Sequence, residues 1–236
     1  DGKIGADSTL FGNVYIKGGG DPTLGSEFAG NPDFLNVWTD EIKKAGIKTI
    51  AGRVLADESI YNTEAVNPKW TWEDMGNYYA SGVYGLSYKD NTYRLILKSG
   101  QVGTQPEILR TDPEIKGLKF DNNLLSTNIS YDSAYLYGIP RSNLRIIRGA
   151  IPANKDEFVI KGDIPEPGAL LISDFTGLLT KSGIKVNMLN ISESTRRIIY
   201  THYSPPLSEI ITEINVRSNN HYAEHIFRYL SVKFTG

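Results

Sequence analysis

Two amphipathic helices, each followed by a glycine and separated by a long stretch rich in β-forming residues, constrain the possible fold most. The first is predicted to begin after Asp33 and to end at Gly46, and the second spans about 167–182 and ends at Gly183. Their apolar faces consist of Phe34, Trp38, Ile42 and Ala45 in the first and of Leu171, Phe175, Leu178 and Leu179 in the second. Because such a face must cover a sheet or another helix, both helices are expected in an α/β layer.

Short strands are predicted after the first helix and between the two helices. One strand is expected to begin near Ile47 and to run to Asp57. Alternating or β-branched residues predict four more strands, at 92–97, 135–137, 144–147 and 157–160. The predicted class is therefore α/β, in the multi-domain α+β sense, with a β-rich module at 84–161 nested in an α/β unit formed by 12–83 and 162–190.

The last third of the chain predicts two further helices. Ser204 followed by two prolines indicates the start of the first of them. Two apolar stripes at helical spacing follow, Leu207, Ile210, Ile211 and Ile214, then Tyr222, Ile226, Tyr229 and Leu230. The polar residues 218–220 separate the stripes and are predicted to form a hinge between the helices.

Composition excludes several classes of function. The 236 residues include 25 basic and 27 acidic side chains, a formal net charge of −2, and the basic residues are scattered rather than clustered. No nucleic-acid partner is therefore expected. The absence of cysteine excludes disulfides, a thiol nucleophile and cysteine-bound zinc. No run approaches the roughly 18 apolar residues of a membrane span, so a soluble chain is expected.

Histidines at 202, 221 and 225 are candidates for metal ligands, because His221 and His225 have the i,i+4 spacing of a helical zinc pair. The metalloprotease pattern also needs Glu directly after the first histidine, where this chain has Tyr222. The pair is therefore predicted to be surface or interhelix histidines, and no metal or organic cofactor is expected.

Three tripeptide or tetrapeptide patterns of serine acyltransferases, S-x-x-K, S-x-N and K-[ST]-G, occur by letter. The S-x-x-K match at 182–185 is rejected because Gly183 ends a helix there, whereas a nucleophile should begin one. Matches at 98–100, 126–128 and 181–183 have no supporting context. Only Ser218-Asn219-Asn220 lies between two helices, where its side chains can face a cleft, although Asn220 could instead merely cap the helix that follows.

The region from 204 to 224 closely resembles the S-P-P-L…N-x-x-S-[DN]-N-x-x-A-E signature of the D-Ala-D-Ala carboxypeptidase/endopeptidase family, peptidase S13. Further segments resemble the same family in the same order: 12–24, 46–57, 70–74, 148–152 and 167–183. The resemblance covers nearly the whole chain. It implies a penicillin-binding, β-lactamase-like transpeptidase domain, with residues 1–11 at its edge and 191–236 as its partial core, interrupted by the inserted domains.

The resemblance also implies site residues. Ser218 would relay a proton between a catalytic lysine and the leaving amine, and Asn220 would bond the substrate's peptide carbonyl. Asp74 would pair with the free amine of the stem peptide's diamino acid, with Tyr79 as its apolar neighbour, although Asp74 could also be a plain surface carboxylate. Asn219 stands where many relatives have Asp, outside the two catalytic positions.

The departures from the family pattern shape the functional expectation. The nucleophile motif and the K-T-G motif are not in this sequence, since the terminal residues 233–236 carry an extra residue and follow the hinge too closely. The chain is thus expected to be an internal fragment, inactive alone, of a serine-type carboxypeptidase of the periplasm or cell envelope. Its expected ligands are peptidoglycan stem peptides and β-lactams. The alternative is a non-catalytic module that binds peptidoglycan or organises envelope enzymes.

Overall fold

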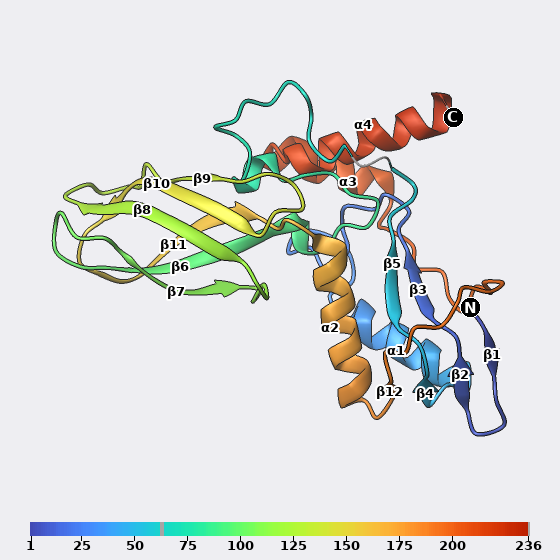
Figure 1. Ribbon diagram of the computed structural model, residues 1–236. Coiled ribbons are helices and arrows are strands. Elements are labelled where there is room, and N and C mark those ends of the chain that lie inside the picture. Colours follow the sequence, from blue (N-terminus) through green and yellow to red (C-terminus); the bar gives the residue numbers. More distant parts are fainter. Residues whose placement is uncertain (62–63, 236) are drawn as a thin grey trace.

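The computed structural model describes residues 1–61 and 64–235 and has three parts (Figure 1). A β module extends to one side, an α/β layer lies below it, and a pair of helices lies across the top. The α-helices are α1 (Phe34–Lys44), α2 (Pro167–Lys181), α3 (Leu207–Arg217) and α4 (Asn220–Thr235). Two short 3-10 turns, η1 (Tyr78–Ala80) and η2 (Lys89–Asn91), precede the module.

The α/β layer is built on two small sheets. The first has the order β1 (Lys3–Ile4), β2 (Thr9–Phe11), β4 (Thr49–Ile50) and β12 (Lys185–Val186), and the second pairs β3 (Val14–Lys17) with β5 (Val54–Asp57) in parallel. Trp38 of α1 packs edge-on against Phe175 of α2, with ring centroids 5.7 Å apart, so the two helices share one core. Both helices end as predicted, at Gly46 and Gly183 with φ of +80° and +86°.

The prediction of one strand from Ile47 to Asp57 is wrong, because β4 and β5 belong to different sheets. The strand is interrupted at Gly52, where the backbone packs so closely that a Cβ atom would collide with Asn13 and the carbonyl of Gly12. Asn13 Oδ1 accepts a hydrogen bond from the backbone of Arg53 at 3.0 Å and so closes the break. The local pattern predicts one strand, and a contact with a side chain 39 positions away divides it into two.

The β module consists of two three-stranded sheets. Their orders are β8 (Lys119–Thr127), β10 (Leu144–Pro152), β9 (Tyr135–Tyr137) and β11 (Lys155–Asp163), β6 (Thr92–Ser99), β7 (Glu107–Asp112). The four strands predicted within this region are confirmed, whereas β7 and β8 were missed. Their sequences are rich in polar residues, and most of their side chains are exposed or only half-buried.

A buried ion pair joins the β module to the rest of the chain. Arg145 of β10 is fully buried, and its Nη2 lies 2.8 Å from Oδ1 of Asp163, the last residue of β11. Arg145 also donates to the carbonyl of Ser142 at 2.7 Å, and Asp163 donates its backbone N–H to Gly76 at 3.0 Å. The pair thus connects both sheets of the module to the segment that precedes η1.

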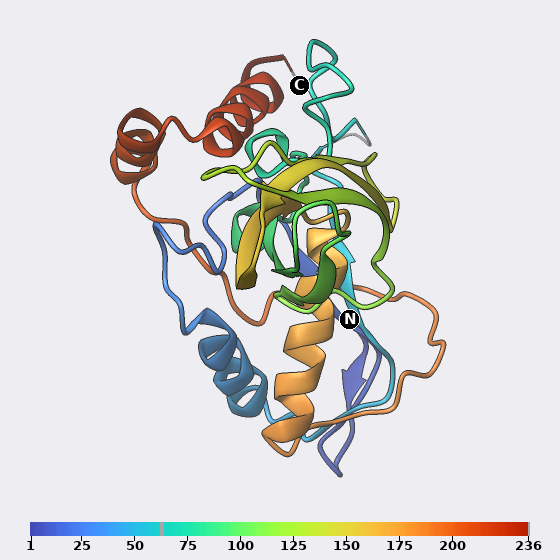
Figure 2. The same cartoon turned by 90° about the vertical axis from the view of Figure 1, so that its left-hand side faces the viewer.

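The helices α3 and α4 lie on the remainder through a limited contact (Figure 2). Ile210 of α3 is buried, but Leu207 and Ile211 of the predicted stripe are exposed by 56% and 42%. In α4 the predicted stripe is likewise exposed at Tyr229 and Leu230. The apolar faces expected from periodicity are therefore only partly covered, which leaves α4 to be held by other groups. Within the described residues, no helix is both long and apolar enough to cross a membrane.

The ion pair between Arg145 and Asp163 is expected to matter for stability. Replacing Arg145 by Ala should lower the free energy of unfolding by about 3–5 kcal/mol, because the buried Asp163 carboxylate loses its partner. The double variant Arg145→Met with Asp163→Leu should recover much of that loss. Urea unfolding followed by circular dichroism measures both.

Arg110→Ala is the matched control, because it removes an arginine that pairs with Glu157 at 2.8 Å on the exposed surface of the same module. This substitution should leave the free energy of unfolding nearly unchanged. Equal destabilisation by Arg110→Ala and Arg145→Ala would contradict the assignment of the buried pair as the anchor of the module.

Candidate active site

The polar hinge between α3 and α4 presents Asn220. Ser218 ends α3 in the left-handed conformation, with φ of 52° and ψ of 44°, and its side chain is exposed. Asn219 caps α4, because its Oδ1 accepts a hydrogen bond from the backbone of Tyr222 at 3.1 Å. The alternative in which Asn220 serves as this cap is wrong. Asn220 is instead the first helical residue, and its exposed amide points away from the helix backbone to another segment.

That other segment is the loop around η1, which carries Asp74 and Tyr79. Asn220 Nδ2 donates to the backbone carbonyl of Tyr79 at 3.0 Å. Burial raises the pKa of Tyr79, and the negative charge of Asp74 adds to the rise. The backbone N–H of Asn77, which precedes η1, donates to the carbonyl of Asp74 at 3.2 Å, so Asp74 and Tyr79 lie in consecutive turns. The structure therefore brings together three of the four predicted site residues. Ser218 lies two positions before Asn220, and no hydrogen bond of its hydroxyl occurs within the described part of the chain.

Asp74 is held in a fixed orientation by its own loop. Its Oδ2 accepts hydrogen bonds from the backbone and the hydroxyl of Thr71, both at 3.0 Å. Asn77 closes the same turn by donating to the carbonyl of Glu73 at 2.8 Å, and its Oδ1 accepts from the backbone of Leu136 in β9. Asp74 is half-buried, and its other oxygen, Oδ1, accepts no hydrogen bond from the described residues.

A buried polar network fastens α4 to the inserted segments. His225 is 1% exposed, with Nδ1 lying 3.1 Å from the carbonyl of Gly20 and Nε2 lying 2.9 Å from Ser87 Oγ. A carbonyl only accepts, so Nδ1 carries the proton and Nε2 accepts from the Ser87 hydroxyl. Asn91 Nδ2 in turn donates to Ser87 Oγ at 3.0 Å. The imidazole is therefore neutral and fully hydrogen-bonded, and burial lowers the pKa of His225 to about 3.

His221 lies beside His225 without any such partners. It is 5% exposed, both its ring nitrogens lack hydrogen-bond partners, and its ring centroid is 4.5 Å from that of His225. Burial, followed by repulsion from His225, lowers the pKa of His221 well below its ordinary value. Of the two predicted alternatives, surface or interhelix histidines, the surface alternative is wrong, because both rings are buried. Within 1–61 and 64–235 no third His, Asp or Glu joins them in a group able to hold a metal ion.

Two further side chains of the hinge signature dock α4. The hydroxyl of Tyr222 lies 2.6 Å from Ser26 Oγ and 3.0 Å from Oδ1 of the buried Asp90. Glu224 accepts a hydrogen bond from Asn67 Nδ2 at 2.9 Å. Sequence reasoning missed these contacts. A signal was present, since 221, 222 and 225 share one helical face, but the predicted stripe included only Tyr222 of these three residues.

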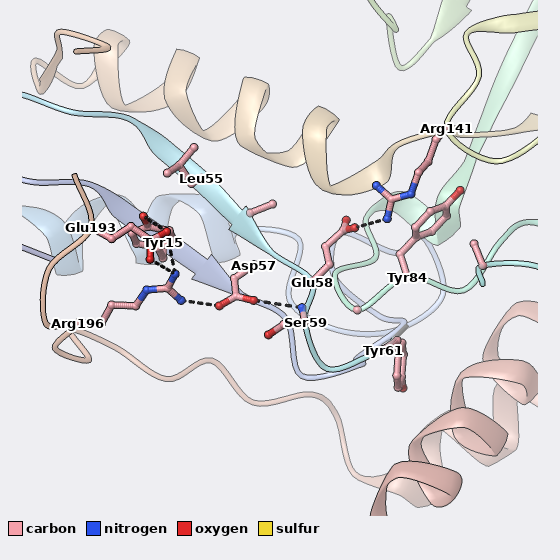
Figure 3. A pocket seen from close by; sticks show the side chains of 13 residues that line it. Tyr15, Leu55, Asp57, Glu58, Ser59, Tyr61, Tyr84, Arg141, Glu193 and Arg196 are labelled. Atoms are coloured by element: carbon pink, nitrogen blue, oxygen red, sulfur yellow. Dashed lines mark hydrogen bonds and ion pairs between the residues drawn. The ribbon is translucent and has the colours of Figure 1, made fainter. Parts of the chain in front are cut away.

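A cavity of about 630 Å³ at the carboxyl ends of β3 and β5 gathers none of the predicted site residues (Figure 3). Its charges are already paired: Arg196 lies 2.5 Å from Asp57, and Arg141 lies 3.1 Å from Glu58. The guanidinium of Arg196 also stacks on the ring of Tyr15 at 3.7 Å. These contacts tie the extended segment 187–206 to the α/β layer, and they pair the charged side chains among the described lining residues with one another.

The whole chain is similar in structure to solved penicillin-binding proteins. The crystal structure of penicillin-binding protein 4 (dacB) from Haemophilus influenzae matches with a TM-score of 0.73 and 20% identity, over 100% of this chain and 51% of that one. The same protein complexed with a novel β-lactam matches with a TM-score of 0.63 and 18% identity, over 100% and 50%. The fold is therefore the mixed α/β fold of a penicillin-binding protein.

Sequence comparison then identifies the family. A D-alanyl-D-alanine carboxypeptidase from Actinomadura sp. (strain R39) is 21% identical over 236 residues, 95% of this chain and 43% of the relative. DacB from Haemophilus influenzae is 20% identical over 243 residues, 99% of this chain and 51% of the relative. The chain thus spans about half the length of these relatives or less. The D-Ala-D-Ala carboxypeptidase 3 (S13) family matches residues 1–236, and the chain belongs to that family.

The two buried histidines predict a loss of stability in acid. Their folded pKa values lie below 6.5 because of burial, so the unfolded chain binds more protons below that pH. The stability contribution is complete above pH 6.5 and should fall by up to about 1.4 kcal/mol per pH unit for each histidine below it. His221→Leu should remove one histidine's share of this slope. Urea unfolding at pH values between 7.5 and 5.0 tests this expectation.

His225→Leu is the matched comparison, since it leaves Gly20 and Ser87 without their partner and should cost about 1–3 kcal/mol at pH 7.5. His221→Leu breaks no hydrogen bond and should cost much less. Burial raises the pKa of Asp90, so this group adds stability as the pH falls and opposes the loss caused by the histidines. This contribution is the same in the wild type and in both variants. An unchanged pH slope in His221→Leu would contradict the assignment.

Proposed function

We propose that the protein carrying this chain is a serine-type D-Ala-D-Ala carboxypeptidase/endopeptidase that acts on peptidoglycan stem peptides in the cell envelope. The observation that carries the proposal is the hydrogen bond between Asn220 and Tyr79, which sets the S-x-N hinge against the loop of Asp74. Membership of the S13 family supports the reaction class. The names of the relatives, D-alanyl-D-alanine carboxypeptidase and penicillin-binding protein 4, support the substrate and inhibition by β-lactams.

The proposed reaction is acyl transfer through a covalent intermediate. A serine hydroxyl outside these 236 residues attacks the carbonyl carbon of the penultimate D-Ala, the C–N bond breaks, and the terminal D-Ala leaves with a proton. Water then hydrolyses the ester and restores the serine. In this scheme Ser218 passes the proton toward the leaving amine, and Asn220 Nδ2 donates to the peptide carbonyl in place of its present acceptor, Tyr79.

The proposed substrate contacts lie on the neighbouring loop. The Oδ1 oxygen of Asp74 accepts the ammonium group of the stem peptide's diamino acid, while the ring of Tyr79 covers its aliphatic carbons. The fixed orientation of Asp74 supports this role, because a carboxylate already held by Thr71 loses little freedom on binding. We also propose the domain division expected from sequence, 12–83 with 162–190, nested 84–161, and 191–236 in the catalytic domain. Residues 1–11, expected at the edge of the catalytic domain, are instead assigned to the α/β unit, because β2 pairs with β4.

Substitution of the hinge residues tests the reaction. In the full-length protein, Ser218→Ala and Asn220→Ala should each lower kcat for D-Ala release from a stem pentapeptide by about 10²–10³-fold, because each removes a group that acts in the transition state. Glu209→Gln, which changes an exposed carboxylate in the first turn of α3, should leave the rate unchanged. Release of D-Ala is followed by mass spectrometry.

Intact mass after incubation with a penicillin separates this function from its alternative. One penicilloyl group should add to the full-length wild type, and slowly to the hinge variants. A full-length protein that releases no D-Ala and takes no penicilloyl group would refute the enzyme and support the non-catalytic peptidoglycan-binding module.

The role of Asp74 predicts selectivity for a charged amine. Asp74→Asn should raise KM about 5-fold for a stem peptide with a free side-chain amine, since a partly exposed ion pair contributes roughly 1 kcal/mol. The same variant should change KM little for a peptide with that amine acetylated. Glu73→Gln is the matched control on the adjacent, exposed carboxylate. Equal effects of both variants, or an equal effect on both peptides, would show that Asp74 is a plain surface carboxylate.

A further inference from the structure

A strip of aromatic side chains runs from the candidate active site onto the β module. Trp72 lies two positions before Asp74, in the loop that Asp74 closes by its hydrogen bonds to Thr71. The rings of Tyr135 and Tyr137 have centroids 6.4 Å apart, and Trp72 stacks on Tyr137 at 5.9 Å with 28° between the ring planes. Trp72, Tyr135 and Tyr137 are called the aromatic strip below.

The aromatic strip faces outward. Residues 135 and 137 alternate with Leu136 in β9, so the two tyrosines share the face opposite to a leucine that is 1% exposed. Trp72 is 50% exposed and Tyr135 is 44% exposed, although large aromatic side chains are usually covered. Because β9 is the edge strand of its sheet, nothing within the described residues extends the sheet beyond it.

The strip is also rigid, because its two segments are joined by hydrogen bonds. Gly138 at the end of β9 donates its backbone N–H to the carbonyl of Met75 at 3.1 Å. The backbone of Leu136 donates to Asn77 Oδ1 at 3.1 Å. These bonds hold the loop of Trp72 and the strand of Tyr137 in one arrangement, so the rings need little ordering when a ligand binds.

The chemistry of the strip fits a carbohydrate. Indole and phenol rings each offer a flat apolar face with a polar N–H or O–H at the edge. A pyranose ring presents the complementary surface, an apolar C–H face with hydroxyl groups around its rim. A lipid or an amphipathic helix would instead match aliphatic side chains, and the strip contains none.

We propose that the aromatic strip binds the glycan strand of peptidoglycan, which lies along the β module while its attached stem peptide enters the cleft at Asn220. The inference rests on the proposed function and narrows its substrate class to peptides still linked to the polymer. Continuity with the proposed peptide site supports this choice of ligand, because the strip begins at Trp72, in the loop that carries Asp74, and leads away from it along β9.

Binding to glycan strands freed of stem peptides by an amidase tests the strip directly. The full-length wild type should bind the immobilised strands, and the double variant Trp72→Ala with Tyr137→Ala should bind at least 10-fold more weakly. Trp72→Phe with Tyr137→Phe keeps both rings and should stay within about 3-fold of the wild type. Tyr203→Ala removes a tyrosine that is 81% exposed on the segment before α3, and should not change binding.

Kinetics on two substrates separates the strip from the peptide site. In the double alanine variant, kcat/KM for intact sacculi should fall at least 5-fold more than kcat/KM for a soluble stem pentapeptide. Equal losses would place these rings in the peptide site and overturn the proposal, as would a wild type that does not bind the stripped strands. Failure of the proposed function itself is distinct, since the wild type would then release no D-Ala from the soluble pentapeptide.

Discussion

The position of Asn220 depends on hydrogen bonds that are buried beneath the first turns of α4. His225 is bonded at both ring nitrogens, and Tyr222 contacts Asp90 within the same interface. An apolar stripe tolerates small sliding movements, whereas a buried donor that loses its acceptor costs about 1–3 kcal/mol. The polar interface therefore fixes both the rotation of α4 about its axis and its position along that axis. This placement sets the amide of Asn220 against the backbone of Tyr79.

The two halves of the candidate site are anchored separately. The hinge is fixed by α4, whereas the loop of Asp74 is fixed by its bonds to Thr71 and by the attachment of Asn77 to β9. This loop in turn lies next to the buried pair of Arg145 and Asp163, because Asp163 donates to Gly76. The inserted parts of the chain thus do more than extend the surface. They carry one wall of the site and hold it by contacts that are independent of the hinge.

The sequence predicted those features that depend on neighbouring residues. Helical periodicity and a glycine at positive φ are local, so the ends of α1 and α2 at Gly46 and Gly183 were predicted correctly. The break at Gly52 was missed because it depends on Asn13, which is distant in sequence. The buried state of His225 was missed for the same reason, since Gly20 and Ser87 lie more than 130 positions away.

Within the candidate site, the contact between the hinge and Tyr79 could not have been predicted from either segment alone. Spacing and polarity located the hinge between two helices. The roles of Asn219 and Asn220 were decided by geometry instead, because both amides are able to cap a helix and only Asn219 bonds the backbone of Tyr222. The aromatic strip was missed because Trp72 and Tyr137 meet only after the β module has folded.

The nested module also bears on how the chain can assemble. β12 pairs with β4 across more than 130 residues, a separation that would make closure of the α/β layer entropically costly for a flexible chain. Thr92 and Asp163, the first residue of β6 and the last of β11, are direct cross-strand partners. A module that folds first therefore presents its entry and exit side by side. Once the module has folded, it separates the flanking segments by no more than a tight turn would. The module then adds little to the conformational entropy that is lost when β12 pairs with β4.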